Sequence, residues 1–223
     1  KKKSSISLMS YPILYSFKRC PYAMRARMAL YLAEIKCEIR EIRLSNKPEH
    51  MLEISPKGTV PILILEDEVI DESYDIVNWV IKKHDIFNDN LRSDQINLTE
   101  SLIKIFDEEF KYHLDRYKYS TRYENTDSDF HRAECLKILI DLEIITSDSK
   151  WIFGEKLNKL DISILPFIRQ FRIANPGWFD SLEEISKIKK ILNNYLDSEE
   201  FKKIMFKYDE WQLGSKPIFF PST

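Results

Sequence analysis

The chain has 223 residues, 43% hydrophobic and 31% charged, which is enough to bury a core in one large domain or two modest ones. Its net charge of -2 at pH 7 gives no basic field, and this argues against nucleic acid as a partner. No apolar run approaches the roughly 18 to 20 residues of a membrane span. The lysine-rich start lacks the apolar stretch of a secretory signal. We therefore expect a cytoplasmic protein with no membrane contact, with Met9 as its natural start and the residues before it an extension.

The first part of the chain alternates strand and helix signals. Short apolar or alternating runs predict strands, and apolar residues at helical spacing predict helices. The expected order is strand, helix, strand, helix, a two-stranded hairpin and a helix, over residues 12–17, 24–35, 37–44, 49–54, 60–65 with 69–70, and 73–83. Residues 10–84 are thus predicted to form an α/β domain.

A polar, turn-rich stretch at residues 85–93 predicts a linker. Strand signals then largely stop. Helices are predicted over residues 94–119, 127–145, 161–174, 182–196 and 199–208. Residues 94–223 are therefore expected to form a second, all-α domain.

Cys20-Pro21-Tyr22-Ala23 has the outline of a redox motif without its second cysteine. Proline suits the first position of a helix. Cys20 is therefore expected at the helix start, with its sulfur facing unpaired N–H groups that stabilise a thiolate and lower its pKa. Because Ala23 cannot close a local disulfide, an external thiol would have to resolve a mixed disulfide. The alternative is a buried cysteine before an ordinary helix.

The remaining cysteines and the histidines predict neither a disulfide framework nor a metal site. Three cysteines are too few and too scattered for a disulfide scaffold, which favours a reducing compartment. The histidines show no ligand spacing with one another or with the cysteines; they are His50, His84, His113 and His131. No metal is expected.

Two further segments bear on the cysteine. Pro61 stands at the entry to a predicted strand, which makes sense if the Val60–Pro61 bond is cis and turns the Val60 backbone outward to pair with an extended peptide. Ser73 is a natural helix cap that can receive a carboxylate, and Glu72 beside it can hold an ammonium group. A carboxylate and an amine on one carbon form the free end of a γ-glutamyl group. An ordinary turn and simple helix capping are the alternatives.

With these three segments in this order, the sequence resembles the cytosolic glutathione transferases over nearly its whole length. The resemblance implies a thioredoxin-like domain followed by an all-helical domain. The Cys-Pro-Tyr-Ala motif is most similar to the omega-like, glutaredoxin-like branch, whose cysteine is the nucleophile. The stretch from Asn175-Pro-Gly-Trp178 to Trp211 also resembles a group of bacterial transferases of this type.

The resemblance assigns roles to individual residues. Cys20 takes the role of the catalytic cysteine, and Arg25 matches an arginine in the first turns of that helix. The implied glutathione-binding residues are Tyr22 beside the ligand, Lys47 at the glycine carboxylate, Val60 and Pro61 at the cysteinyl backbone, and Glu72 and Ser73 at the γ-glutamyl end. Asn158 and Asp161 resemble the family's structural capping box, with Asn158 replacing the usual Ser or Thr.

The second substrate is expected to meet aromatic and basic side chains at the end of the first long helix. Tyr112, Arg116, Tyr119 and Tyr123 recur at helical spacing, if the helix persists that far. In the family this region overhangs the cysteine, so they are candidates for an electrophile pocket. An aromatic and basic pocket favours an oxidised, anionic or glutathionylated substrate. The alternative is that these tyrosines brace the two domains.

The sequence thus predicts a glutathione-dependent thiol transferase, with glutathione as co-substrate, that acts in deglutathionylation or dehydroascorbate-type reduction. The family resemblance also implies a homodimer. A non-enzymatic binding or regulatory protein on the same scaffold is the alternative from another class. An enzyme dedicated to one metabolic step, such as reductive dehalogenation or ether cleavage, is a third.

Overall fold

The computed structural model describes residues 11–87 and 91–222. Met9, the expected start, lies outside the described residues. By their contacts, the described residues form two compact units: unit 1 runs to His84 and resumes at Lys203, and unit 2 is Asp85–Lys202. The sequence predicts one helical domain over residues 94–223, but residues from 203 onward group with unit 1 instead. Within the described ranges, no helix has the length and apolarity needed to cross a bilayer.

Unit 1 is built on a five-stranded sheet in the order β4-β3-β1-β2-β5. β1 pairs in parallel with β2 and antiparallel with β3, while β3–β4 and β2–β5 are antiparallel. In chain order the elements are β1 (Ile13–Ser16), α1 (Pro21–Leu32), β2 (Cys37–Glu41), α2 (Glu49–Ile54), β3 (Ile62–Ile64), β4 (Val69–Ile70), α3 (Ser73–Lys83) and β5 (Phe219–Phe220).

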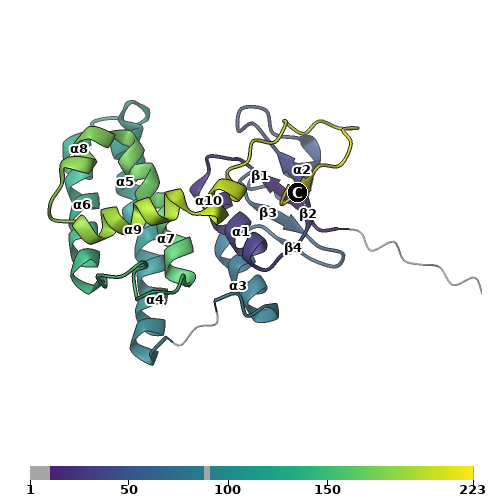
Figure 1. The fold of residues 1–223 in the computed structure, drawn as a ribbon. Helices are drawn as coiled ribbons and strands as arrows, with labels where there is room; N and C mark the ends of the chain where they lie inside the picture. The colour runs from purple at the N-terminus through teal and green to yellow at the C-terminus, as the bar shows by residue number, and fades with distance from the viewer. Residues whose placement is uncertain (1–10, 88–90, 223) are drawn as a thin grey trace, which may run out of the picture. The chain divides into compact units, whose positions relative to one another are not determined.

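The two faces of this sheet are covered by different helices. Because successive side chains of a strand point to opposite faces, Leu14 and Tyr15 of β1 are buried on different sides. Tyr15 packs in a cluster with Met51 of α2 and Ile62 of β3, so α2 covers that face. α1 and α3 pack against each other, and Figure 1 shows them together on the other side of the strands from α2.

The fifth strand comes from the C-terminal segment, which the sequence assigned no strand. Phe220 pairs with Cys37 at the edge of β2, and the N–H of Trp211 donates to the carbonyl oxygen of Glu41 at 2.8 Å. The ring of Trp211 stands edge-on to that of Tyr15, with 6.0 Å between centroids. Residues more than 160 positions apart thus complete one sheet.

Unit 2 is mainly helical over its described length, with its longest helix-free connection at residues 146–158. Its helices are α4 (Ser93–Ile105), the π-helical segment η1 (Phe106–Phe110), α5 (Lys111–Lys118), the short 3₁₀ turn η2 (Ser120–Arg122), α6 (Ser128–Ile145), α7 (Lys159–Ala174), α8 (Pro176–Ser181) and α9 (Ser186–Asp197); α10 (Glu199–Ile204) leads back into unit 1. Three predicted helices differ from those observed. Residues 94–119 contain the π segment, residues 182–185 connect α8 and α9, and α10 ends at Ile204 instead of residue 208.

The predicted capping box at the start of α7 is confirmed. Asn158 Oδ1 accepts from the N–H of Leu160 at 2.8 Å, and Asp161 Oδ2 accepts from the N–H of Asn158 at 2.9 Å. The other carboxylate oxygen of Asp161 accepts from the N–H of Ile152 at 3.0 Å. Both side chains are buried, so the box satisfies backbone donors that water does not reach.

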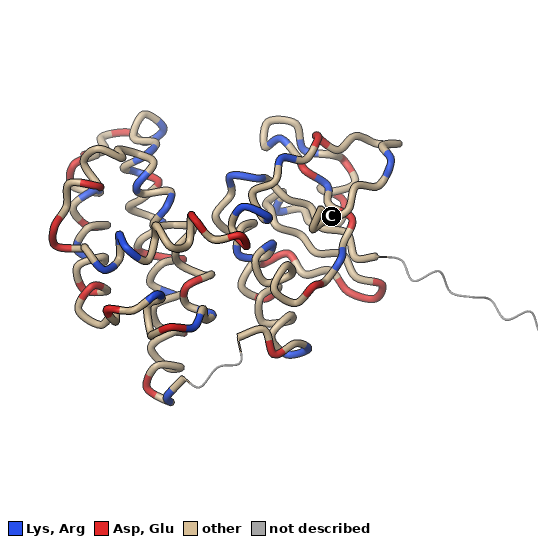
Figure 2. Tube along the Cα trace, in the orientation of Figure 1, with Lys and Arg blue, Asp and Glu red and all other residues tan. Residues whose placement is uncertain are grey.

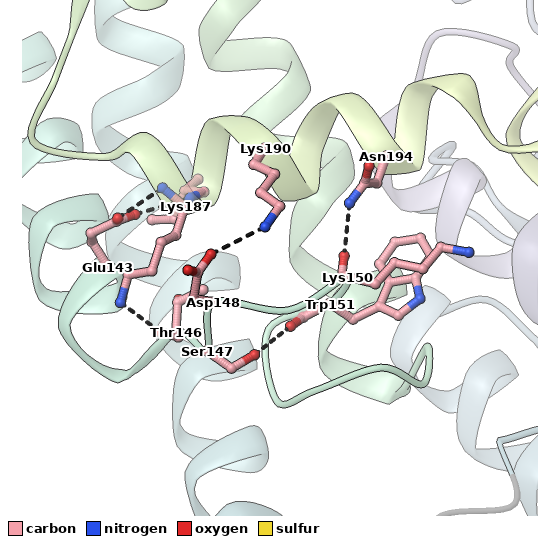
Figure 3. A network of polar contacts seen from close by, with 10 residues as sticks. Glu143, Thr146, Ser147, Asp148, Lys150, Trp151, Lys187, Lys190 and Asn194 are labelled. Carbon is pink, nitrogen blue, oxygen red and sulfur yellow. Dashed lines mark hydrogen bonds and ion pairs between the residues drawn. The ribbon is translucent and has the colours of Figure 1, made fainter.

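A polar network joins the end of α6 and the turn after it to α9 (Figure 3). The two carboxylate oxygens of Glu143 accept from the N–H groups of Lys187 and Ile188, at 2.8 and 2.9 Å. These are free N–H groups of the first turn of α9, so Glu143 caps that helix from another part of the chain. Lys187 Nζ in turn donates to the carbonyl oxygen of Thr146 at 2.6 Å.

Basic and acidic residues are mixed along the backbone of both units (Figure 2). In the picture, segments carrying Lys or Arg are interleaved with segments carrying Asp or Glu, in the sheet unit and among the helices alike. This distribution agrees with the near-balanced total of 34 basic and 36 acidic residues.

Candidate functional site

Cys20 lies directly before α1, as the sequence predicts, with Pro21 as the first helical residue. The side chain makes no capping hydrogen bond to the helix, which differs from the predicted approach of the sulfur to the helix N–H groups. Its Sγ instead lies 3.7 Å from the carbonyl oxygen of Val60, with the geometry of an S–H donor. Cys20 is a free cysteine and is half-buried.

The other two cysteines are enclosed. Burial, followed by the charge of the neighbouring Glu38, raises the pKa of Cys37 to about 12. Burial, followed by the charges of Glu134 and Asp115, likewise raises the pKa of Cys135 well above its usual value. Since the thiolate is the nucleophilic form, these two thiols stay protonated and unreactive at neutral pH. Cys20 alone of the three is accessible.

The Val60–Pro61 bond is cis, as predicted, and its Val60 carbonyl is the group that Cys20 approaches. Gly58 stands two residues earlier with a φ of +61°, a conformation that suits glycine. A Cβ atom at Gly58 would lie 3.0 Å from Leu52 Cδ2 and 3.4 Å from Lys47 Nζ. The structure therefore brings the ammonium group of Lys47 to the loop that leads into the cis-proline.

Arg25 joins the first turns of α1 to the start of α3. It is fully buried; its Nη1 donates to Ser73 Oγ at 3.4 Å, and its guanidinium lies 5.5 Å from the centroid of the Tyr22 ring. Ser73 was predicted to cap α3, but Glu72 is the N-cap residue and Ser73 is the first helical residue. Arg25 thus positions two of the predicted ligand-binding side chains relative to each other.

Glu72 pairs with a residue that the sequence did not single out. Lys57 Nζ lies 2.5 Å from Glu72 Oε1 and 3.1 Å from Asp71 Oδ1. The hydroxyl of Ser55 donates to Asp71 Oδ2 at 2.7 Å, and this hydrogen bond, together with Lys57, lowers the pKa of Asp71. Glu72 and Lys57 are both largely exposed, so their pair exchanges readily with other charged groups.

Three of the four residues predicted for the electrophile pocket form a cluster in unit 2, called here the Tyr–Arg cluster: Tyr112, Arg116 and Tyr123. The guanidinium of Arg116 lies 3.5 Å from the ring centroid of Tyr112 and 4.5 Å from that of Tyr123. The predicted helix does not persist to Tyr123, because α5 ends at Lys118 and a 3₁₀ turn follows. Tyr119 contacts Arg122 instead, whose guanidinium is 4.1 Å from its ring.

Two histidines that show no ligand spacing in the sequence nevertheless meet in the fold. The Nδ1 atoms of His113 and His131 are 2.7 Å apart, so one ring donates to the other. Burial, followed by electrostatic interactions with His113 and Arg116, lowers the pKa of His131. His113 also lies with Glu109 and Glu134, and the ligand atoms of these three residues are all within 4.8 Å of one another.

Comparison with known proteins agrees with this architecture. Residues 14–89 match the family described as glutathione S-transferase, N-terminal domain. The chain is 27% identical over 180 residues to a probable glutathione S-transferase, parA, of Nicotiana tabacum, with 77% of this chain and 74% of that protein covered. The chain is thus similar to glutathione S-transferases, with the family model matching its first part.

Two other relatives and one solved structure extend the comparison. It is 21% identical over 201 residues to a probable chloroplastic glutathione S-transferase, DHAR2, of Oryza sativa, covering 89% of this chain and 70% of that protein. It is 36% identical over 72 residues to glutathione S-transferase omega-1 of Mus musculus, covering 27% of this chain and 30% of that protein. A glutathione transferase family member from Pseudomonas fluorescens, solved with two glutathione molecules bound, superposes with a TM-score of 0.76 at 15% identity, covering 90% of this chain and 95% of that one. The fold class predicted from the sequence is thus confirmed.

Sequence reasoning missed two features of the candidate site. Lys57 lies in a short loop, where one lysine carries no pattern to mark it, and only the fold places it beside Glu72. Arg25 was noted as a match but not as the link between Tyr22 and Ser73, because that link joins α1 to α3 across 48 positions. The signal available in the sequence was an arginine among the mostly apolar residues that begin this helix, and the structure shows it to be buried.

Proposed function

We propose that this protein is a glutathione-dependent thiol transferase of the omega-like, cysteine-type branch, with Cys20 as the nucleophile. The Cys20 thiolate attacks the glutathione sulfur of a mixed disulfide, and the bond between that sulfur and the substrate sulfur breaks. The substrate leaves as a thiolate and Cys20 becomes glutathionylated. A second glutathione thiolate then attacks this mixed disulfide, which releases oxidised glutathione and restores Cys20. Two glutathione molecules would reduce dehydroascorbate with the same electron balance.

The observation that carries this proposal is the placement of Cys20 Sγ 3.7 Å from the carbonyl oxygen of Val60, at the start of α1. A thiol at a helix N-terminus is in a position that favours its thiolate. The cis bond at Val60–Pro61 lies beside it, so an extended peptide paired with the Val60 backbone would bring its own sulfur to Cys20. The remaining groups of the proposed glutathione site are Tyr22, Lys47, Glu72 and Ser73.

Each end of glutathione has a group of suitable charge in unit 1. Lys47 Nζ beside Gly58 suits the glycine carboxylate. Glu72, at the start of α3, suits the γ-glutamyl ammonium. This ammonium would replace Lys57 as the partner of the Glu72 carboxylate. The Ser73 hydroxyl and the first N–H groups of α3 suit the γ-glutamyl carboxylate. The similarity to relatives named as an omega-class and a DHAR glutathione transferase supports thiol chemistry over conjugation.

The decisive experiment compares Cys20→Ala with Cys37→Ala in the reduction of a glutathionylated peptide. We expect Cys20→Ala to lose at least a hundredfold in turnover. Cys37→Ala, which removes a buried and unreactive thiol, should keep the turnover rate of the wild type. Mass spectrometry of the wild-type protein after one turnover without free glutathione should find the added glutathione on Cys20. Undiminished activity in Cys20→Ala would refute the proposal. Failure of the wild-type protein to bind glutathione in calorimetry would favour a non-enzymatic role.

We also propose that the Tyr–Arg cluster contacts the second substrate. Arg116 between Tyr112 and Tyr123 offers a cationic, aromatic surface, which suits an anionic or glutathionylated substrate. Arg116→Met should raise the KM for a glutathionylated acidic peptide without changing the KM for free glutathione. Arg122→Met, which removes a neighbouring arginine that contacts Tyr119, is the matched control. Equal effects of Arg116→Met on both substrates would assign the cluster a structural role.

A further inference from the structure

We propose that Glu109, His113 and Glu134 form a binding site for one divalent transition-metal ion, with Zn²⁺ as the ion that suits them. The ligand atoms of the three side chains lie within 4.8 Å of one another. The ligands of a tetrahedral zinc ion are about 3.3 Å apart, given zinc–ligand distances near 2.0–2.1 Å. Glu109 is exposed and Glu134 half-buried, so modest side-chain movements bring both carboxylates to this spacing.

The packing of α5 against α6 holds the three groups at one level. Two hydrogen bonds join α5 to α6, Ser128 Oγ to the Tyr117 carbonyl and His113 to His131, and a third runs from Cys135 Sγ to the carbonyl of Phe110, the last residue of η1; together they set an antiparallel register. The paired positions therefore move toward the C-terminus in α5 as they move toward the N-terminus in α6. This register brings Glu134, next to Cys135, opposite the turn that contains Phe110 and its neighbour Glu109.

The start of α5 gives the first two ligands a common face. Glu109 and His113 are four residues apart, a spacing that places side chains next to each other on a helix. Glu109 belongs to the π-helical segment Phe106–Phe110, which leads directly into α5. Single π turns of this kind are frequent at functional sites.

His131 prepares His113 to bind a cation. When His113 Nδ1–H donates to His131 Nδ1, 2.7 Å away, the other ring nitrogen of His113 carries a free lone pair. Metal-binding histidines commonly have this arrangement, in which a hydrogen bond from one ring nitrogen orients the other. His131 would therefore act as a positioning residue, outside the ligand set.

One imidazole and two carboxylates suit zinc and its neighbours better than they suit magnesium or calcium, which favour oxygen ligands alone. Three protein ligands leave a fourth position for water or another donor. The two carboxylates also offset the charge of the ion. Among the described residues, neither Glu109 nor Glu134 takes part in an ion pair. Arg116, one turn beyond His113, is stacked between tyrosine rings in the Tyr–Arg cluster.

The test is metal titration of the Cys20→Ser protein, because a thiolate at Cys20 would itself bind zinc. We expect calorimetry to find one Zn²⁺ per chain. Glu109→Gln and Glu134→Gln should each weaken the affinity at least tenfold, and His113→Gln should abolish binding. Glu108→Gln is the matched control, since Glu108 is exposed in the same π segment but lies outside the three-residue set. It should bind zinc like its parent.

A second measurement separates loss of metal from loss of fold. Zinc should raise the thermal midpoint of the parent and of Glu108→Gln, but not that of Glu109→Gln, whose exposed site tolerates the change. Co²⁺ bound in place of zinc should give the visible absorption of a low-coordinate nitrogen and oxygen site, without a thiolate band. Absence of zinc binding in the parent, or equal affinity in Glu109→Gln and Glu108→Gln, would overturn the proposal.

Discussion

The guanidinium of Arg27, buried in α1, donates from Nε to the carbonyl oxygen of Ile204 at 2.8 Å, across 177 positions of the chain. The same side chain donates from Nη1 to Ser16 Oγ at 2.6 Å and from Nη2 to the Lys18 carbonyl at 2.7 Å. One side chain therefore ties the end of β1, the loop before Cys20 and the returning C-terminal segment to α1.

Arg27→Met should destabilise unit 1 strongly. The methionine fills part of the space but leaves the buried oxygens around Arg27 without their donor, and each unsatisfied group costs about 1–3 kcal/mol. We expect a loss of at least about 3 kcal/mol in the free energy of unfolding, measured with urea. Arg19→Met, at an exposed position in the same loop, should change this free energy by less than about 0.5 kcal/mol. Equal stability of the two variants would contradict this role for Arg27.

Asn158→Ala should destabilise unit 2 by removing one half of the buried capping box. The Asn158 side chain accepts from the N–H groups of Leu160 and Asp161 at the start of α7. Loss of such a cap costs about 1–2 kcal/mol. Asn158→Ser, which keeps a capping oxygen, should retain most of the stability. Urea unfolding followed by circular dichroism measures both, and the prediction fails if the serine variant is no more stable than the alanine variant.

Glu72 and Lys57 should have opposite effects on glutathione affinity. Glu72→Gln removes the proposed partner of the γ-glutamyl ammonium, and a charged hydrogen bond of about 1.5–3 kcal/mol corresponds to at least a tenfold rise in the KM for glutathione. Lys57→Met removes a competing cation. Because the exposed pair is worth no more than about 1 kcal/mol, the KM should fall by at most about fivefold.

The control for these two variants is Lys82→Met, at the other end of α3. It should leave the KM for glutathione unchanged. A rise in this KM for Lys57→Met would mean that Lys57 orients Glu72 and does not compete with the ligand. The Cys20 chemistry proposed above does not depend on which of these two roles Lys57 has.

The hydrogen bond from Ser55 should make stability depend on pH through Asp71. The hydrogen bond from Ser55, followed by the interactions with Lys57, lowers the folded-state pKa of Asp71 below its ordinary value of 3.8. A carboxyl group with a lowered pKa contributes stability that is fully present above its unfolded pKa and is lost as pH falls through its folded pKa. The gap in unfolding free energy between the wild type and Asp71→Asn should be constant above about pH 5 and shrink below pH 3.8. Urea unfolding from pH 3 to pH 6 measures this gap; a gap that stays constant throughout would contradict the assignment.

Local sequence patterns predicted the helices that bury apolar residues at regular spacing. The boundaries of α3, residues 73–83, follow from apolar residues at helical spacing, of which Ile76, Val77 and Val80 are buried. Pairing that joins distant parts of the chain left no local signal. β5 is only two residues long, and its place is set by β2, about 180 positions earlier.

In the candidate site, too, features with a local sequence motif were predicted and features that depend on distant contacts were not. The cysteine before α1 and the cis-proline carry local motifs, so the sequence placed them correctly. The pairing of His113 with His131 depends on how α5 packs on α6, which no spacing within one helix reveals. The same holds for Lys57, whose partner Glu72 lies beyond a hairpin.

Because β5 and the Ile204 carbonyl belong to unit 1, the unit that a ribosome begins first cannot be finished until all of unit 2 has been synthesised. Until then the edge of β2 lacks its partner strand and Arg27 lacks one of its acceptors. Once residue 202 has been synthesised, unit 2 has all of its residues, because it is continuous in sequence. At that stage the sheet that carries the Cys20 region still lacks its last strand. Folding order in this protein is therefore expected to run against the order of translation.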